Sequence, residues 1–231
     1  MIDVKDLSKA YHGNVVLNIP SLNIPKGESF GLVGNNGAGK TTFFRLILDL
    51  IRATSGTVYI NSEDVMGSVG WKSYTGSYLD EGFLIDFLTP EEYFEFLADI
   101  NGLSKGDVKE FYATFEEFFN NEVLGKKKFI RELSSGNQKK VGIAAALMTK
   151  PELLILDEPF NSLDPTTQIR LKAILKNIQE DRNITALISS HDLNHVTEVC
   201  ERIVVLETGN VVQDIKTTAT TLKDLEKYFD L

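Results

Sequence analysis

The chain has 231 residues, 42% of them hydrophobic, with 33 acidic against 24 basic side chains, a net charge of −9 and a pI of about 4.9. This composition excludes a disordered chain, and no apolar run approaches the roughly 18 residues of a membrane-spanning helix. The acidic balance argues against sequence-independent nucleic-acid binding, which needs a basic surface to displace phosphate counterions. Because Cys200 is the single cysteine and no hydrophobic leader follows Met1, we expect a cytoplasmic protein without disulfides.

Short apolar runs alternate with longer amphipathic stretches, which is typical of an α/β domain with a mostly parallel sheet. Four runs are apolar throughout, as strands covered on both faces should be: 29–33, 153–156, 185–189 and 203–206. The first 28 residues and the segment 56–60 alternate instead, and Thr208-Gly209-Asn210 indicates a hairpin turn. We therefore predict an antiparallel portion beside the parallel core.

A phosphate-binding loop follows the strand 29–33. The sequence there matches G-x-x-x-x-G-K-[ST] and continues into a predicted amphipathic helix that reaches Ile51. Glycines let backbone N–H groups point at a phosphate, and the helix N-terminus adds a partial positive charge. Lys40 is predicted to reach the β- and γ-phosphates, and Thr41 to ligate Mg²⁺. The predicted phosphate-binding residues are Gly34, Asn35, Asn36, Gly37, Ala38, Gly39, Lys40, Thr41 and Thr42.

An internal segment is rich in phenylalanine, with eight of the 14 lying between Phe83 and Phe119. The run Thr89-Pro-Glu-Glu92 predicts a helix start with a capping box, and Gly102 predicts its end. A second helix places apolar side chains at helical spacing: Val108, Phe111, Tyr112, Phe115, Phe118 and Phe119. These aromatics are expected to pack within a helical lobe, with a docking surface for another protein as the alternative.

The lobe divides the predicted architecture into two parts. We predict one domain whose α/β nucleotide-binding core comprises residues 1–82 and 136–231, with residues 83–135 as an inserted helical subdomain.

The strand 153–156 ends in Asp157-Glu158-Pro159, which supplies the carboxylate that a metal beside the phosphate loop requires. Ligands of open parallel sheets bind outside the carboxyl ends of the strands. We expect Asp157 to hold Mg²⁺ and Glu158 to polarise the attacking water. The alternative is a strand end that only caps the sheet edge and begins a turn.

Three further motifs complete the pattern. They are Leu133-Ser-Ser-Gly-Asn-Gln-Lys-Lys140, Asn161-Ser-Leu-Asp164 and Ser189-Ser-His-Asp192. With the loop and the strand end above, the sequence resembles the ATP-binding cassette of ABC transporters: Walker A, signature, Walker B with its glutamate, D-loop and H-loop histidine, in the family's order. The resemblance covers essentially the whole chain and implies a RecA-like P-loop NTPase core.

The resemblance also implies roles for individual residues. Tyr11 is implied to stack on adenine, and His191 to touch the γ-phosphate as a catalytic residue beside Glu158 and Lys40. Asp164, with Ser162, is implied to belong to the loop that communicates between two sites. The contacts with ATP bound to the opposite subunit are assigned to Ser134, Ser135 and Gly136.

The sequence departs from the family's commonest pattern at two places. Ser135 and Asn137 replace a glycine and the glutamine of Leu-Ser-Gly-Gly-Gln. Where the family usually has a glutamine for Mg²⁺ and the attacking water, alignment selects Asp80, and a one-residue shift selects Glu81. An ionised carboxylate can ligate Mg²⁺ but cannot donate a hydrogen bond. An acid at this point is similar to some exporter-type cassettes.

The sequence thus predicts an ATP-hydrolysing transporter subunit. The resemblance implies a head-to-tail dimer with a second copy or a homologous cassette, which encloses two ATP–Mg and drives a separate transmembrane permease, in the direction of export, at the inner face of the membrane. Two alternatives remain: a soluble ABC-type ATPase acting on nucleic acid or ribosomes, and a nucleotide-sensing module with little hydrolysis. Phosphate release by the purified chain distinguishes the last one.

Overall fold

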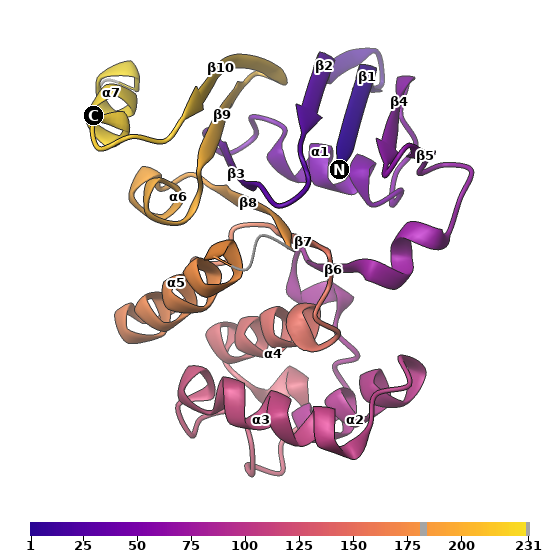
Figure 1. Ribbon diagram of the computed structural model, residues 1–231, viewed down its shortest axis with the longest axis vertical. Helices are drawn as coiled ribbons and strands as arrows, with labels where there is room; N and C mark the ends of the chain where they lie inside the picture. The colour runs from indigo at the N-terminus through magenta and orange to yellow at the C-terminus, as the bar shows by residue number, and fades with distance from the viewer. Residues whose placement is uncertain (181–183, 230–231) are drawn as a thin grey trace.

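The computed structural model describes residues 1–180 and 184–229 (Figure 1). The described strands form one ten-stranded sheet in the order β5-β4-β1-β2-β10-β9-β3-β8-β7-β6. Their bounds are β1 Ile2–Tyr11, β2 Asn14–Ile24, β3 Ser29–Val33, β4 Ser55–Ile60, β5 Glu63–Asp64, β6 Thr75–Tyr78, β7 Leu153–Leu156, β8 Thr185–Ser190, β9 Arg202–Glu207 and β10 Asn210–Lys216.

Helices cover the sheet and extend beyond its β6 edge (Figure 1). The α-helices are α1 Lys40–Ile47, α2 Pro90–Ile100, α3 Lys105–Phe119, α4 Ser135–Met148, α5 Pro165–Glu180, α6 Leu193–Val199 and α7 Thr221–Tyr228. Short 3₁₀ helices are η1 Gly70–Tyr74, η2 Glu81–Phe83 and η3 Ile130–Glu132. Within the described residues, no helix combines the length and the apolar character needed to span a bilayer.

The strands β6, β7, β8, β3 and β9 are parallel neighbours, and β3, β7 and β8 are buried along their whole length. Leu156 pairs with Ile188, and Val33 pairs with Ser190. Because these registers align the carboxyl ends of β7, β8 and β3, the segments that follow them meet at one edge. The predicted α/β class with a parallel core is confirmed.

The remaining strands supply the predicted antiparallel portion. β1 pairs antiparallel with β2 and β4, and β9 pairs antiparallel with β10. In the turn between β9 and β10, Thr208 and Gly209 have φ of 47° and 80°. Two successive positive φ values are what a tight hairpin turn requires, so the predicted hairpin is confirmed.

The helix after the phosphate loop ends at Ile47, so the prediction that it reaches Ile51 was wrong. Asp49 takes a left-handed φ of 50°, and the N–H of Leu50 donates to the carbonyl of Arg45. The chain therefore reverses just after Leu48. The apolar pattern continued past the helix because Leu48 is buried in the turn itself.

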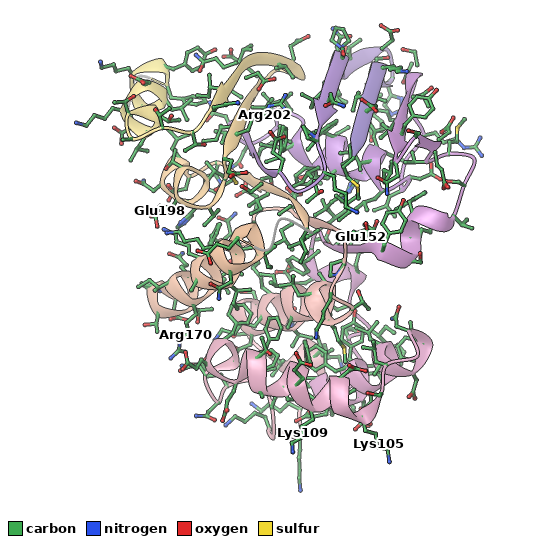
Figure 2. All side chains as sticks on the ribbon, viewed as in Figure 1. Lys105, Lys109, Glu152, Arg170, Glu198 and Arg202 are labelled. Atoms are coloured by element: carbon green, nitrogen blue, oxygen red, sulfur yellow. The ribbon has the colours of Figure 1, made fainter. Side chains whose placement is uncertain are left out.

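The phenylalanine-rich segment forms α2 and α3, which lie against α4 at the end of the molecule away from β1 (Figure 1). The Thr89 capping box and the left-handed Gly102 begin and end α2 as predicted. Lys105 and Lys109 point outward from α3 (Figure 2). The buried phenylalanines are Phe94, Phe111, Phe115, Phe118 and Phe119, whereas the exposed ones are Phe83, Phe87 and Phe96.

The aromatic core of this segment is continuous with apolar side chains of α4 and β7, including Leu154 and Leu156. The division into a core of 1–82 and 136–231 and a lobe of 83–135 stays a prediction, because α4 packs against both parts.

Candidate active site

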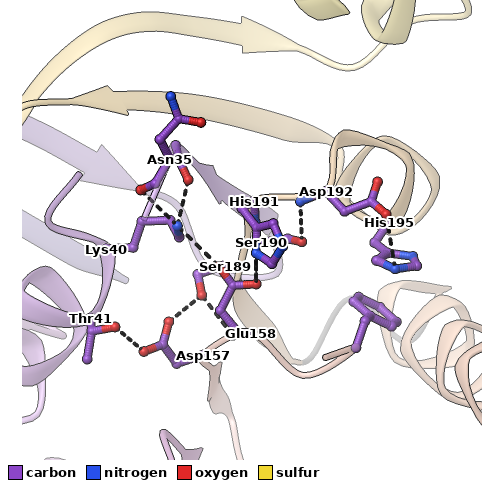
Figure 3. Close-up of polar contacts among 12 residues, drawn as sticks. Asn35, Lys40, Thr41, Asp157, Glu158, Ser189, Ser190, His191, Asp192 and His195 are labelled. Atoms are coloured by element: carbon purple, nitrogen blue, oxygen red, sulfur yellow. Dashed lines mark hydrogen bonds and ion pairs between the residues drawn. The ribbon is translucent and has the colours of Figure 1, made fainter. Parts of the chain in front are cut away.

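The site forms where β3, β7 and β8 end (Figure 3). β3 leads into the phosphate loop, β7 into Asp157 and Glu158, and β8 into His191. Segments far apart in the sequence meet here because the three strands are parallel neighbours.

The phosphate loop depends on two close approaches of its backbone. A Cβ on Gly34 would lie 2.3 Å from the carbonyl oxygen of Leu206 on β9. Gly39, at the N-terminus of α1, has a φ of 108°, which side-chain-bearing residues rarely adopt. Asn35 and Asn36 are exposed, whereas Ala38 is buried.

Among the three predicted catalytic side chains, Glu158 contacts each of the other two. The Lys40 ammonium is buried, lies 3.1 Å from Glu158 Oε1 and donates to the carbonyl of Gly34 at 2.6 Å. Glu158 Oε2 lies 3.0 Å from His191 Nδ1 and accepts from the His191 backbone N–H at 3.3 Å. Glu158 therefore stands between the lysine of the loop and the histidine after β8 (Figure 3).

The two predicted metal ligands Thr41 and Asp157 are also in contact. The Thr41 hydroxyl donates to Asp157 Oδ2 at 2.5 Å, and the Ser189 hydroxyl donates to Asp157 Oδ1. Burial raises the pKa of Asp157, and the hydrogen bonds from Ser189 and Thr41 oppose that shift. A hydroxyl oxygen and a carboxylate oxygen side by side next to a phosphate loop suit Mg²⁺, which usually takes few protein ligands and keeps water and phosphate oxygens.

The signature segment lies apart from the phosphate loop of its own chain. No hydrogen bond or ion pair within residues 1–180 and 184–229 joins 134–136 to 34–42. Ser134 is the N-cap of α4, is exposed and accepts from the N–H of Asn137. A Cβ on Gly136 would lie 2.5 Å from the carbonyl oxygen of Ser162, so the signature packs against the D-loop.

Asp164 anchors that D-loop. Its carboxylate accepts from the N–H and the hydroxyl of Thr167, and these hydrogen bonds lower the pKa of Asp164. Lys140, buried on α4, lies 2.6 Å from Glu122 and 4.0 Å from Asp164. The signature helix, the lobe and the D-loop are thereby linked within one chain.

A family model for the ABC transporter matches residues 17–161, which is more than half of the chain. The chain belongs to the ABC transporter family. The bacitracin transport ATP-binding protein BcrA of Enterococcus faecalis is 34% identical over 221 residues, covering 93% of this cassette and 69% of that protein. The methionine import ATP-binding protein MetN of Carboxydothermus hydrogenoformans is 33% identical over 224 residues, covering 93% of this cassette and 66% of that protein.

A solved structure extends the likeness to the fold and the assembly. The ATP-binding cassette MJ0796, as a dimer in a post-hydrolysis state bound to ADP and Pi, has a TM-score of 0.80 and 27% identity, covering 95% of this cassette and 100% of that chain. The chain is thus the ATP-binding subunit of an ABC transporter and an ATPase.

The two acids of the cassette's Asp80-Glu81 pair face different neighbours. Asp80 accepts from the Gly82 N–H and lies 3.5 Å from Arg45 on α1, and no hydrogen bond or ion pair of the described residues joins it to Thr41 or Asp157. Glu81 Oε1 lies 4.0 Å from the Lys139 ammonium, which in turn binds the carbonyl of Glu158. These contacts thus join Glu81 to the Glu158 carbonyl through Lys139, and Asp80 to the helix that follows the phosphate loop.

Tyr11, expected to stack on adenine, ends β1 in the antiparallel part of the cassette. Its ring is exposed, with the Lys9 ammonium 4.8 Å from the ring centroid.

Sequence reasoning missed two residues of the site. Ser189 donates to Asp157 and accepts from the Glu158 N–H at 2.9 Å. The sequence feature that could have identified it is a hydroxyl at the end of an otherwise apolar, buried strand. Lys139 donates to the Glu158 carbonyl. The feature that could have identified it is a cation on the buried side of the signature helix.

Proposed function

We propose that ATP with Mg²⁺ binds between the phosphate loop of one cassette and the signature of a second copy, or of a homologous cassette, in a head-to-tail dimer. The separation of the signature from the loop of its own chain supports this arrangement, as does the dimeric relative. Ser134 is exposed at the N-terminus of α4, where backbone N–H groups and the helix dipole favour a phosphate. Ser135 and Gly136 continue the same surface, and Tyr11 is proposed to contact the adenine.

The contact of Glu158 with both Lys40 and His191 is the observation that carries the mechanism. Lys40 binds the β- and γ-phosphates and offsets the charge that develops as the terminal phosphoryl group leaves. Glu158 accepts a proton from the water that attacks the γ-phosphorus, and the bond to the ADP oxygen breaks. His191 holds Glu158 and the γ-phosphate in the reacting arrangement.

Thr41 and Asp157 are the residues that would hold Mg²⁺, with Glu81 favoured over Asp80 as an acid beside the metal's water shell. The metal ion, when bound, neutralises charge on the β- and γ-phosphate oxygens.

We further propose that a separate permease docks in a groove between the core and the lobe. This groove, of about 450 Å³, is lined by Leu50 after α1, by Trp71 and Phe83 before α2, and by Leu97 and Ala145 on α2 and α4. Leu50 and Phe83 are exposed there. A cytoplasmic segment of the permease that inserts apolar side chains would bury them and place the cassette at the inner face of the membrane.

Export is the direction that we propose, on the ground of the acidic pair Asp80-Glu81. The relatives differ in direction, because one is named for bacitracin transport and the other for methionine import. The direction can be measured as substrate movement in vesicles that contain the permease and the cassette. Export moves substrate away from the side of the membrane on which the cassette binds ATP, and movement toward that side would contradict it.

Replacement of the base tests the mechanism. Glu158→Gln removes the proton acceptor, so hydrolysis should slow by at least about 100-fold while ATP still binds. Because the ATP-bound dimer then persists, it should accumulate in size-exclusion chromatography with ATP. Lys40→Ala, in contrast, should lose ATP binding, as measured with a fluorescent ATP analogue.

The matched control is Glu152→Gln at the other end of β7, where the side chain pairs with Lys26 on the surface (Figure 2). It should retain wild-type hydrolysis. A Glu158→Gln protein that hydrolyses ATP at the wild-type rate, or stays monomeric at saturating ATP, would contradict the proposed mechanism.

A further inference from the structure

Lys139 is a buried cation that none of the steps above uses. It lies in the second turn of α4, and only 7% of its surface is exposed. Burial lowers the pKa of Lys139, but the carboxylates of Glu81, Glu158 and Asp157 oppose this shift because they favour the ammonium. A buried ammonium has a high desolvation cost, so its partners indicate what it does.

The partners of Lys139 lie at the catalytic strand end. Its Nζ donates to the carbonyl oxygen of Glu158 at 3.0 Å, lies 4.0 Å from Glu81 Oε1 and stands 5.6 Å from the centroid of the Tyr78 ring. The Asp157 N–H donates to the carbonyl of Tyr78 at 2.9 Å. The lysine therefore lies near the ends of β6 and β7, which the acidic residues of the site follow.

Glu158 requires such a partner because its backbone is left-handed, with a φ of 46°. Few residues other than glycine adopt this conformation, and surrounding contacts must maintain it. Ser189 holds the N–H side of Glu158 at 2.9 Å, and Lys139 holds the carbonyl side. These two hydrogen bonds hold the backbone from which the Glu158 side chain extends toward Lys40 and His191.

Lys139 shares a rigid helix with the signature. Ser134, the N-cap of α4, precedes it by five residues, which is roughly 7.5 Å along a helix axis. A cassette that binds at the N-terminus of α4 therefore acts on the same helix that holds the carbonyl of Glu158.

We propose that Lys139 is a positioning residue that orients Glu158 for proton transfer and couples that orientation to the signature segment 134–136. This inference rests on the proposed role of Glu158. The ammonium touches the backbone of the base rather than the reacting atoms, so its loss should lower kcat while ATP binding is retained.

Steady-state ATP hydrolysis by the full chain tests the proposal. Lys139→Met should lower kcat by at least about tenfold, which corresponds to about 1.4 kcal/mol in the activation free energy, because the Glu158 carbonyl loses its charged donor. The KM for ATP should change by less than about twofold. Lys139→Gln, one bond too short to reach the carbonyl, should show the same loss, and Lys139→Arg, which keeps the charged donor, should restore most of the rate.

The matched control is Lys150→Met, because Lys150 follows α4 but pairs with Glu110 at the surface. A wild-type kcat in Lys139→Met and Lys139→Gln would overturn the proposal, and so would an equal loss in Lys139→Arg or a rise in KM that accounts for the loss. Glu158→Gln measured in parallel separates the two failures. If it is inactive while Lys139→Met is fully active, only the role of Lys139 falls; if it is fully active, the proposed mechanism itself falls.

Discussion

His195 is the one histidine among the described residues whose ring is largely enclosed. Its ring stacks on Phe160 with centroids 4.3 Å apart, and its Nε2 lies 3.5 Å from Asp192. Burial lowers its pKa from the ordinary 6.5, with Asp192 opposing the shift. Because Asp192 immediately follows His191, this packing supports the loop that carries the proposed catalytic histidine.

The lowered pKa predicts a pH dependence of stability. The unfolded chain binds a proton at His195 more readily than the folded chain, so the unfolding free energy falls as pH drops below about 6.5. His195→Gln removes this contribution, and urea unfolding between pH 5 and 7.5 should show a shallower slope. His12→Gln, at an exposed histidine in the turn after β1, should keep the wild-type slope. Equal slopes in His195→Gln and the wild type would contradict the explanation.

At the scale of elements, α4 joins the signature to the end of β6 and to the lobe. It begins at the signature, carries Lys139 and Lys140, and packs directly on β6. This contact is unusually close: a Cβ on Gly142 would lie 2.2 Å from the Tyr78 ring, and one on Gly76 would lie 1.9 Å from the carbonyl oxygen of Ala146. Only glycine allows this spacing, which holds Lys139 over the end of β7.

Gly142→Ala should therefore destabilise the cassette. Overpacking typically costs about 1–3 kcal/mol, more than the roughly 1 kcal/mol that alanine gains over glycine within a helix. Gly106→Ala on α3 is the matched control, since its Cβ would meet only the Ser104 hydroxyl at 3.4 Å, and it should stabilise the chain slightly. Denaturant unfolding measures both, and a Gly142→Ala variant as stable as Gly106→Ala would contradict the packing argument.

At the scale of the whole molecule, the nucleotide site and the groove proposed for the permease are joined by the segment between β6 and α2. Tyr78 borders the site through its carbonyl and also lines the groove, and Phe83, five residues later, lines the groove as well. The helix α1 likewise begins at Lys40 in the site and ends before Leu50 in the groove. The proposed docking therefore places the permease a short path of packed chain away from the acids of the site.

Substitution at the groove tests this arrangement. Phe83→Ser removes an exposed aromatic from the groove, so the cassette should copurify poorly with its coexpressed permease while ATP binding is unchanged. Phe87→Ser is the matched control, because Phe87 is exposed in the same segment but does not line the groove. Loss of copurification in both variants, or in neither, would contradict docking in the groove.

The sequence predicts those parts of the structure that depend on residues close together along the chain. The phosphate loop, the Thr89 capping box and the apolar strands depend on local backbone chemistry and on burial of a continuous apolar run, and the structure contains all three. The same local pattern was misleading after Ile47, because Leu48 continues the apolar period within a turn that a left-handed Asp49 creates.

The tertiary structure decided which side chains face the site. Asp80 and Glu81 are adjacent acids in sequence, but the packing of α4 brings Lys139 to Glu81, whereas α1 presents Arg45 to Asp80. Ser189 reaches Asp157 across 32 residues of sequence, through the pairing of β7 with β8. Sequence motifs identify which groups can bind ATP, but contacts between distant segments determine their direction, because a parallel sheet assembles its site from strand ends that are far apart in the chain.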